Sequence, residues 1–194
     1  MSRYDKTHKD ETRRRIIDSA GRRLKRDGID GSGVATLMSD AGLTNGAFYS
    51  HFDSKNDLVA NVLQDQLRTQ AARVTALPSG RDALEEFIRS YLSRDHRDHP
   101  ESGCPSGALL DEIGRLDRQG RDSYTEGVQS IIDAVALRLS QESPSSARSR
   151  AIGLFTLLVG NLQLARAVTD PSMSDGVLEA GIRNALDLLS LESL

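Results

Sequence analysis

Residues 34–55 read VATLMSDAGLTNGAFYSHFDSK and have the pattern of two short helices joined by a tight turn. The first helix is expected over 34–41 and the second over 46–51. Gly42 lies between them and supplies the positive φ that such a turn needs. The spacing predicts a helix-turn-helix, whose second helix can enter a DNA major groove about 12 Å wide.

The side chains of this motif divide into a packing set and a contact set. Leu37 and Phe48 are spaced to pack the two helices against each other. Residues 44–47 open the second helix, where backbone N–H groups and short side chains can approach phosphates and base edges closely. Lys55 opens the next helix, where its ammonium group can contact a phosphate.

Basic side chains are concentrated ahead of the motif. The first 26 residues hold 10 Lys and Arg against 4 Asp and Glu, although the whole chain of 194 residues has a formal net charge of −3. Such a segment suits a polyanionic partner. A solvated basic helix face has the same composition, so charge alone leaves both interpretations open.

Helical periodicity continues through the rest of the chain. A first helix is expected at about 10–27, and a longer one opens at Ser54 and ends before Pro78. Further helices are expected around 84–92, 109–116, 124–135, 146–169 and 174–191. No run of alternating β-branched residues predicts a strand. The predicted fold class is therefore all-α.

Composition excludes several classes of protein. The longest uncharged stretch, 151–165, is shorter than the roughly 18–20 residues of a membrane span, so no contact with a membrane is expected. The N-terminus lacks the apolar core of a secretory signal. A single cysteine, Cys104, rules out an internal disulfide framework and a multi-cysteine zinc site. We therefore expect a cytoplasmic protein without a metal or another cofactor.

The run AGLTNGAFYSHFDSK at residues 41–55, followed by Leu58, resembles the DNA-binding signature of the TetR family of bacterial transcriptional repressors. The length, the helical pattern and the basic first helix are also similar to this family. The resemblance implies a three-helix DNA-binding head over residues 1–54. It also implies a larger antiparallel helical domain over 55–194, which holds an effector pocket and forms a homodimer through its last two helices.

The resemblance also assigns DNA contacts position by position. Positions that usually touch the phosphate backbone are Thr44, Gly46, Tyr49, His51 and Lys55, and positions that more often read bases are Asn45, Ala47 and Ser50. Thr36, on the preceding helix, completes the predicted DNA-binding set. Asn45 stands where a basic residue is frequent in the family, so the operator sequence is left open.

The predicted function is that of a transcriptional regulator and not of an enzyme. We expect a repressor, located at the nucleoid, that binds a near-palindromic double-stranded operator. An unidentified small-molecule effector or modification of the cysteine would release it. The alternatives are a protein–protein regulator, which the basic first helix disfavours, and a helical-bundle ligand carrier or enzyme without DNA binding.

A carrier or enzyme would need convergent acid–base or metal-binding groups. Only the segment 94–100, RDHRDHP, and Glu101 after it offer such a cluster, with His96 and His99 among carboxylates. Interleaved arginines and the terminal proline favour a solvated loop at a helix end over a metal site.

The apolar side chains of the last two predicted helices indicate where a dimer forms. The segment 146–169 has no clean polar face, and together with 174–191 it offers more apolar surface than a monomer of this size covers. The expected interface residues are Leu154, Leu158, Leu162, Leu178, Ile182, Leu186 and Leu189.

Large side chains are candidates for the effector pocket. Phe87, Tyr91, Tyr124 and Phe155 lie on apolar stripes that either line a cavity or form plain core. Cys104 joins this set because Pro105 after it favours the first position of a helix, which makes Cys104 the N-cap.

The helix dipole favours a reactive thiolate at that N-cap position. Asp111 and Glu112 oppose a thiolate, and a lone cysteine is more often an inert hydrophobe. The resemblance adds that some members of the family sense electrophiles or oxidants with a cysteine in the regulatory domain.

Overall fold

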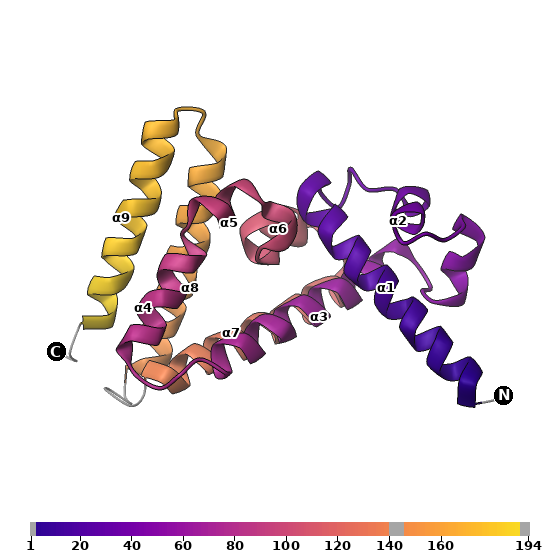
Figure 1. The fold of residues 1–194 in the computed structure, drawn as a ribbon, viewed down its shortest axis with the longest axis horizontal. Helices are drawn as coiled ribbons and strands as arrows, with labels where there is room; N and C mark the ends of the chain where they lie inside the picture. Colours follow the sequence, from indigo (N-terminus) through magenta and orange to yellow (C-terminus); the bar gives the residue numbers. More distant parts are fainter. Residues whose placement is uncertain (1–2, 140–145, 191–194) are drawn as a thin grey trace.

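The computed structural model describes residues 3–139 and 146–190, and these fold into helices and turns without a strand (Figure 1). The all-α prediction is confirmed. The elements are α1 (Arg3–Asp27), α2 (Val34–Asp40), η1 (Asn45–Ser50), α3 (Lys55–Thr75), α4 (Arg81–Tyr91), α5 (Arg94–Asp98), η2 (Pro100–Ser102), α6 (Pro105–Ile113), α7 (Arg118–Leu139), α8 (Ala147–Ala167) and α9 (Pro171–Ser190), where η marks a 3₁₀ helix.

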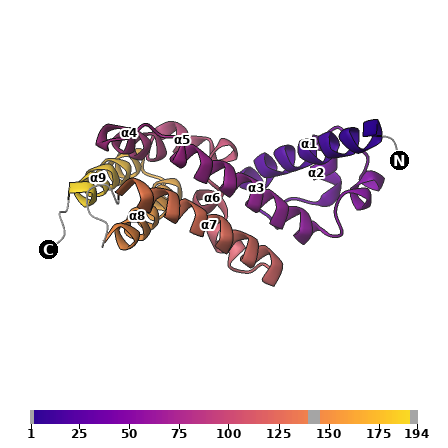
Figure 2. The same cartoon turned by 90° about the horizontal axis from the view of Figure 1, so that it is seen from below.

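The head consists of α1, α2, η1 and the start of α3, at the opposite end of the molecule from α8 and α9 (Figure 2). Its core is formed by side chains at most 1% exposed, among them Ile16, Leu37, Phe48 and Phe52. Gly42 has a φ of +69° in the turn between the helices, as predicted. The second helix of the motif is a 3₁₀ helix. Helix α1 begins at Arg3, well before the predicted start at residue 10. The prediction missed its first turns because they are polar and carry no apolar periodicity.

Helix α3 links the head to the rest of the chain. Its N-terminus is capped reciprocally: the Ser54 side chain accepts from the Asp57 amide at 3.1 Å, and the Asp57 carboxylate accepts from the Asp53 amide at 3.1 Å. Beyond the head, α3 packs along α7. A Cβ added to Gly127 of α7 would lie 2.6 Å from Leu67 of α3, so this glycine permits the close approach.

Helices α4, α8 and α9 form the far end of the molecule, α7 runs beside α3, and α5 and α6 lie between the far end and the head (Figure 1). The α8 residues Leu154, Leu158 and Leu162 are at most 2% exposed within the single chain, and Leu178 and Leu189 of α9 are 3% exposed. The prediction that these five leucines form the dimer interface is therefore wrong: they belong to the core of the protomer. Ile182 and Leu186 are half-buried and remain predicted interface residues.

The segment 94–100 is not a solvated loop. Residues 94–98 form α5, whose N-cap Ser93 accepts from the His96 amide at 3.1 Å. Arg97 donates to the Asp175 carboxylate at 2.8 Å and ties α5 to α9. Arg166 of α8 donates to the carbonyl oxygens of His96 and Arg97 at the other end of α5. The sequence pattern missed this because the partners lie about seventy positions away.

Candidate DNA-binding surface and effector cavity

The predicted DNA-binding residues all have solvent-accessible positions on the head. Those that are exposed are Thr36, Thr44, Asn45, Gly46, Tyr49 and Ser50, whereas Ala47, His51 and Lys55 are half-buried. Together they cover η1, the turn before it, the first turn of α2 and the start of α3. The structure thus presents to solvent a set of mostly small and polar side chains together with the large aromatic ring of Tyr49.

Tyr49 is that ring, and its side chain is 74% exposed. It contacts the buried ring of Phe48 edge to face, with 5.2 Å between ring centroids, and Phe48 in turn packs on Phe52 at 5.8 Å. The two phenylalanines hold η1 on the core, while Tyr49 projects from it. This exposure leaves the ring and its hydroxyl free to contact a partner surface.

Gly46 is not required by the packing of the chain. A Cβ added there would meet no atom within 4 Å, and its φ is not in the left-handed region. The space outside it is open, which suits a partner that approaches the backbone closely. Ser50, at the end of η1, donates its hydroxyl proton to the Ala47 carbonyl at 2.7 Å, which leaves its oxygen as an acceptor.

The surroundings of His51 disfavour its protonated form. Partial burial, with Lys9 and Arg13 adding repulsion, lowers its pKa below the ordinary value. Arg13 was not predicted as part of the site, yet it positions this surface: its guanidinium lies 4.7 Å from the centroid of the Phe52 ring and donates to the Asn61 side chain at 2.8 Å. Arg13 therefore joins α1 to α3 directly behind η1.

Several basic side chains of α1 are neutralised within the head. Arg23 forms ion pairs of 2.6 Å with both Asp27 and Asp40, and Arg26 pairs with Asp27 at 2.8 Å. Among the side chains that the structure describes, Lys9, Arg15, Arg22 and Lys55 have no carboxylate partner within ion-pair distance. These four cations leave the head with uncompensated positive charge, which suits phosphate contacts.

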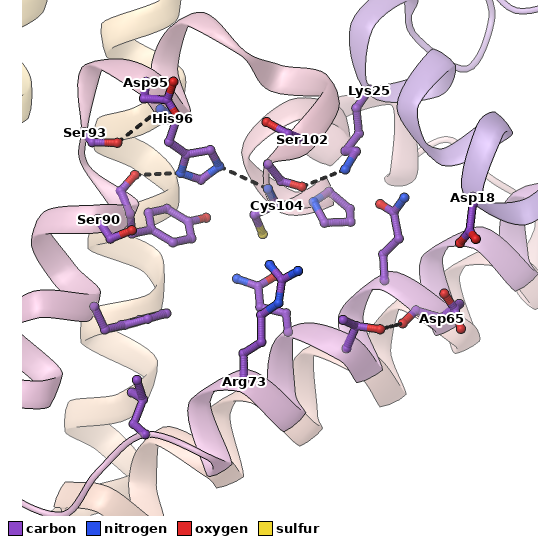
Figure 3. Close-up of a pocket in the computed structure, with 18 of the residues that line it drawn as sticks. Asp18, Lys25, Asp65, Arg73, Ser90, Ser93, Asp95, His96, Ser102 and Cys104 are labelled. Carbon is purple, nitrogen blue, oxygen red and sulfur yellow. Dashed lines mark hydrogen bonds between the residues drawn. The ribbon is translucent and has the colours of Figure 1, made fainter.

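A cavity of about 460 Å³ lies between the head and the following helices (Figure 3). Its walls come from α1, α3, α4, α5 and the Cys104–Pro105 step, and the predicted pocket residues Phe87, Tyr91 and Cys104 line it. Tyr124 and Phe155 do not line it, and their place in an effector pocket stays a prediction. The Tyr124 hydroxyl lies 3.0 Å from the Ser106 hydroxyl, and Phe155 is buried in the core.

Cys104 is the N-cap of α6 and Pro105 is its first residue, as predicted. The thiol makes no capping hydrogen bond, however, and the residue is only 5% exposed. The expected position over free backbone N–H groups is therefore wrong. Glu112 also does not oppose the thiol, because its carboxylate accepts from the head amides of Ile29 and Asp30 at 2.7 and 3.0 Å.

His96 fixes the backbone at Cys104. Its Nδ1 lies 2.7 Å from the Tyr91 carbonyl and its Nε2 lies 3.1 Å from the Cys104 amide nitrogen, which assigns the proton to Nδ1. Burial lowers the pKa of His96, in keeping with an Nε2 that accepts. The imidazole is thus part of the cavity wall, and sequence reasoning found it only as a possible metal ligand.

Lys25 connects the head to the same wall. Its Nζ donates to the Gly103 carbonyl at 2.8 Å, and the residue is 8% exposed. Burial, together with the nearby Arg73, lowers the pKa of Lys25 to about 8, although Cys104 and Glu101 act in the opposite direction. No sequence signal distinguished this lysine from the other cations of α1.

The described part of the chain contains no cluster of three or more His, Cys, Asp or Glu side chains that could bind a metal ion. Among the helices that the structure describes, none has the length and apolar character needed to cross a bilayer.

Comparison with known proteins places the head in a family. Residues 16–62 match the model of the bacterial regulatory proteins of the tetR family. Among curated relatives, the regulator AcrR of Shigella flexneri is 36% identical over 62 residues, which are 32% of this chain and 29% of AcrR. The repressor NemR of Escherichia coli is 24% identical over 127 residues, 63% of this chain and 64% of NemR. The matched stretches thus span less than two thirds of either relative.

Solved structures extend the similarity of fold to almost the whole chain. The reduced form of E. coli NemR superposes with a TM-score of 0.78 at 21% identity, over 90% of this chain and 95% of that one. A TetR-family regulator from Cytophaga hutchinsonii gives a TM-score of 0.75 at 21% identity, over 94% and 95%. The head sequence and the helix-turn-helix geometry agree: residues 16–62 of this chain are a TetR-family DNA-binding head, and the rest of the chain shares the fold of solved TetR-family regulators.

Proposed function

We propose that this protein is a DNA-binding transcriptional regulator, a repressor that acts at the nucleoid and is released from its operator by an effector. The observation that carries the proposal is the solvent-facing Tyr49 beside the open space at Gly46, within a head that has unpaired cations. An enzyme is disfavoured because His96 is engaged in structural hydrogen bonds and its neighbour Arg97 is paired with Asp175.

In vitro selection from a random duplex library tests DNA binding and identifies the operator in the same experiment. The purified protein is expected to enrich one near-palindromic sequence, with half-site centres roughly 34–36 Å apart or slightly more. Selection by the Tyr49→Ala variant is expected to fail. Enrichment of no sequence by the wild-type protein would contradict the proposal.

The homodimer is proposed through the outer face of α8. Ile152, Thr156, Gly160 and Leu164 follow each other at intervals of four residues, and all four are exposed. Ile152 is 42% exposed and Leu164 is 50% exposed, while a Cβ added to Gly160 would meet no atom within 4 Å. This stripe gives a second protomer a close-packing surface, to which the half-buried Ile182 and Leu186 of α9 would add.

The effector is proposed to act in the cavity between the head and the regulatory helices. Lys25 of the head and Cys104 before α6 both line it, so an occupant contacts both sides of the junction. A ligand that fits one arrangement of the two sides better than another shifts the population toward that arrangement. The two heads of a dimer would then lose the spacing that the operator requires.

Covalent modification of Cys104 is a second proposed route to release. The thiol lines the cavity although the residue is largely buried, so a small reagent would have to enter the cavity to reach it. The structure of NemR, which has the same fold, is described as a reduced form. These two observations support a direct test of Cys104.

A further inference from the structure

The cavity between the head and the regulatory helices contains cations without counter-ions. Lys25 is buried, and its only hydrogen-bond acceptor in the described structure is the Gly103 carbonyl. Arg73, on α3, lines the same cavity and forms no ion pair with a described residue. In Figure 3 the Arg73 side chain extends from α3 toward Cys104, with Lys25 above it.

The acidic side chains of the cavity do not compensate these two cations. Asp65 is paired with Arg68 at 3.0 Å and Asp18 with Arg14 at 3.7 Å. Asp95 is paired with His99 at 3.1 Å. Glu101 stabilises the charge on Lys25 only from beyond ion-pair distance. The buried Lys25 thus has no carboxylate within ion-pair distance among the described residues, and the exposed Arg73 beside it has none either, so both can pair with an occupant.

Tyr91 adds a buried hydrogen-bond donor at the same place. The residue is 5% exposed and lines the cavity; its hydroxyl lies near the Cys104 thiol, a weak acceptor, and has no oxygen or nitrogen partner among the described residues. Burial, reinforced by the neighbouring Cys104, raises the pKa of Tyr91 well above its ordinary value, so the hydroxyl keeps its proton. A buried hydroxyl without a strong acceptor is unfavourable, and an oxygen atom of a ligand would satisfy it.

The cavity also has an apolar wall of matching size. Phe87 and Leu77 line it, and the ring of Phe87 lies tilted against that of Tyr91, with 6.1 Å between the ring centroids. A volume of about 460 Å³ lies within the range of small-molecule sites and is large enough for an aromatic or short aliphatic body. Unpaired cations, an unsatisfied donor and an apolar wall therefore converge in one space.

We propose that this cavity binds a small amphipathic organic anion. Its acidic group would lie at Lys25, Arg73 and Tyr91, and its apolar body would lie against Phe87 and Leu77. The inference rests on the proposed effector function and names the chemical class of the effector. Because Lys25 belongs to α1, the bound anion would compete with the Gly103 carbonyl for the ammonium that joins the head to η2 and α6.

Calorimetric titration with naphthoate and with its neutral analogue naphthamide tests this proposal. The two probes share an aromatic body, so the difference in affinity reports the charge. Naphthoate is expected to bind at least about tenfold more tightly, because charge-assisted hydrogen bonds are stronger than neutral ones. Arg73→Gln is expected to abolish most of that difference and to leave naphthamide binding unchanged. Tyr91→Phe is expected to weaken naphthoate binding several-fold.

Arg89→Gln is the matched control, because Arg89 is exposed on α4 and does not line the cavity. Equal affinity for the two probes, no binding of naphthoate at millimolar concentration, or equal effects of Arg73→Gln and Arg89→Gln would overturn the proposal. DNA binding of the protein without a probe is measured separately. A protein that binds naphthoate but no DNA would refute the proposed regulator and support the anion site. A protein that binds DNA but not naphthoate would refute only the anion site.

Discussion

The ammonium group of Lys25 lies 2.8 Å from the carbonyl oxygen of Gly103, and this bond joins the last turn of α1 to the residue before Cys104. A second bond set runs in parallel, from the head amides of Ile29 and Asp30 to the carboxylate of Glu112 on α6. The head is therefore attached to α6 at both ends of that helix. A shift of α6 would be transmitted to α1 through these contacts.

Lys25→Met is expected to stabilise the protein at neutral pH by about 1–2 kcal/mol. The depression of the Lys25 pKa from 10.5 to about 8 corresponds to roughly 3 kcal/mol of burial cost, from which the lost hydrogen bond subtracts about 1. Between pH 8 and 10.5 the unfolded chain holds the proton more tightly than the folded one, so wild-type stability gains from this group as pH rises.

Denaturant unfolding of both proteins at pH 7 and at pH 10 measures this effect. The stability difference between variant and wild type should shrink at the higher pH, where Lys25 is neutral in the folded protein. Lys9→Met serves as the control for an exposed lysine of the same helix. A stability difference between variant and wild type that does not change with pH would show that burying the Lys25 ammonium does not destabilise the folded protein.

Gly46→Ala is expected to separate DNA binding from folding. An added Cβ meets no atom of the protein, and alanine loses less backbone entropy than glycine, so stability should stay equal or rise by less than about 1 kcal/mol. Affinity for the selected operator should fall, because the methyl group occupies the space that a DNA backbone would need. Thermal unfolding and mobility shift on the same preparation check both parts. Unchanged DNA affinity would contradict the proposed contact.

Ile152→Asp and Leu164→Asp are expected to dissociate the homodimer while the protomer stays folded, since both side chains are exposed in the single chain. Leu137→Asp, at an exposed position of α7, should leave the oligomeric state unchanged. Light scattering measures the oligomeric state of each variant, and circular dichroism shows whether the protomer stays folded. A wild-type monomer at micromolar concentration would refute the proposed dimer, and α8 variants that stay dimeric would refute its interface.

Cys104→Ser is expected to remove sensitivity to thiol reagents but not DNA binding. Treatment of the wild-type protein with a quinone, an aldehyde or hypochlorite should release the operator, because an adduct on this thiol would fill the cavity beside Tyr91 and Lys25. Mobility shift after treatment compares the two proteins. If both proteins release DNA equally, or neither does, Cys104 is not the switch.

Sequence reasoning predicted the head well because its signals are local. The positive φ at Gly42, the packing of Phe48 and the cap at Ser54 each depend on residues within a few positions. It failed where the partner is distant in sequence. Periodicity identified Leu158 as buried but not whether its own chain or a second copy covers it, and the chain itself does. Glu112 was misassigned for the same reason.

The most direct test of the account is a mobility-shift titration of the selected operator at several salt concentrations, with wild type, Tyr49→Ala, Lys55→Ala and Arg89→Ala. Wild-type affinity should fall steeply with salt, with a slope of roughly −0.9 per phosphate neutralised. Lys55→Ala should make that slope shallower by about one such contact. Tyr49→Ala should weaken binding strongly, and Arg89→Ala, at an exposed position of α4 away from the head, should match wild type. If Tyr49→Ala and Lys55→Ala both bind like wild type, the helix-turn-helix is not the DNA-binding surface.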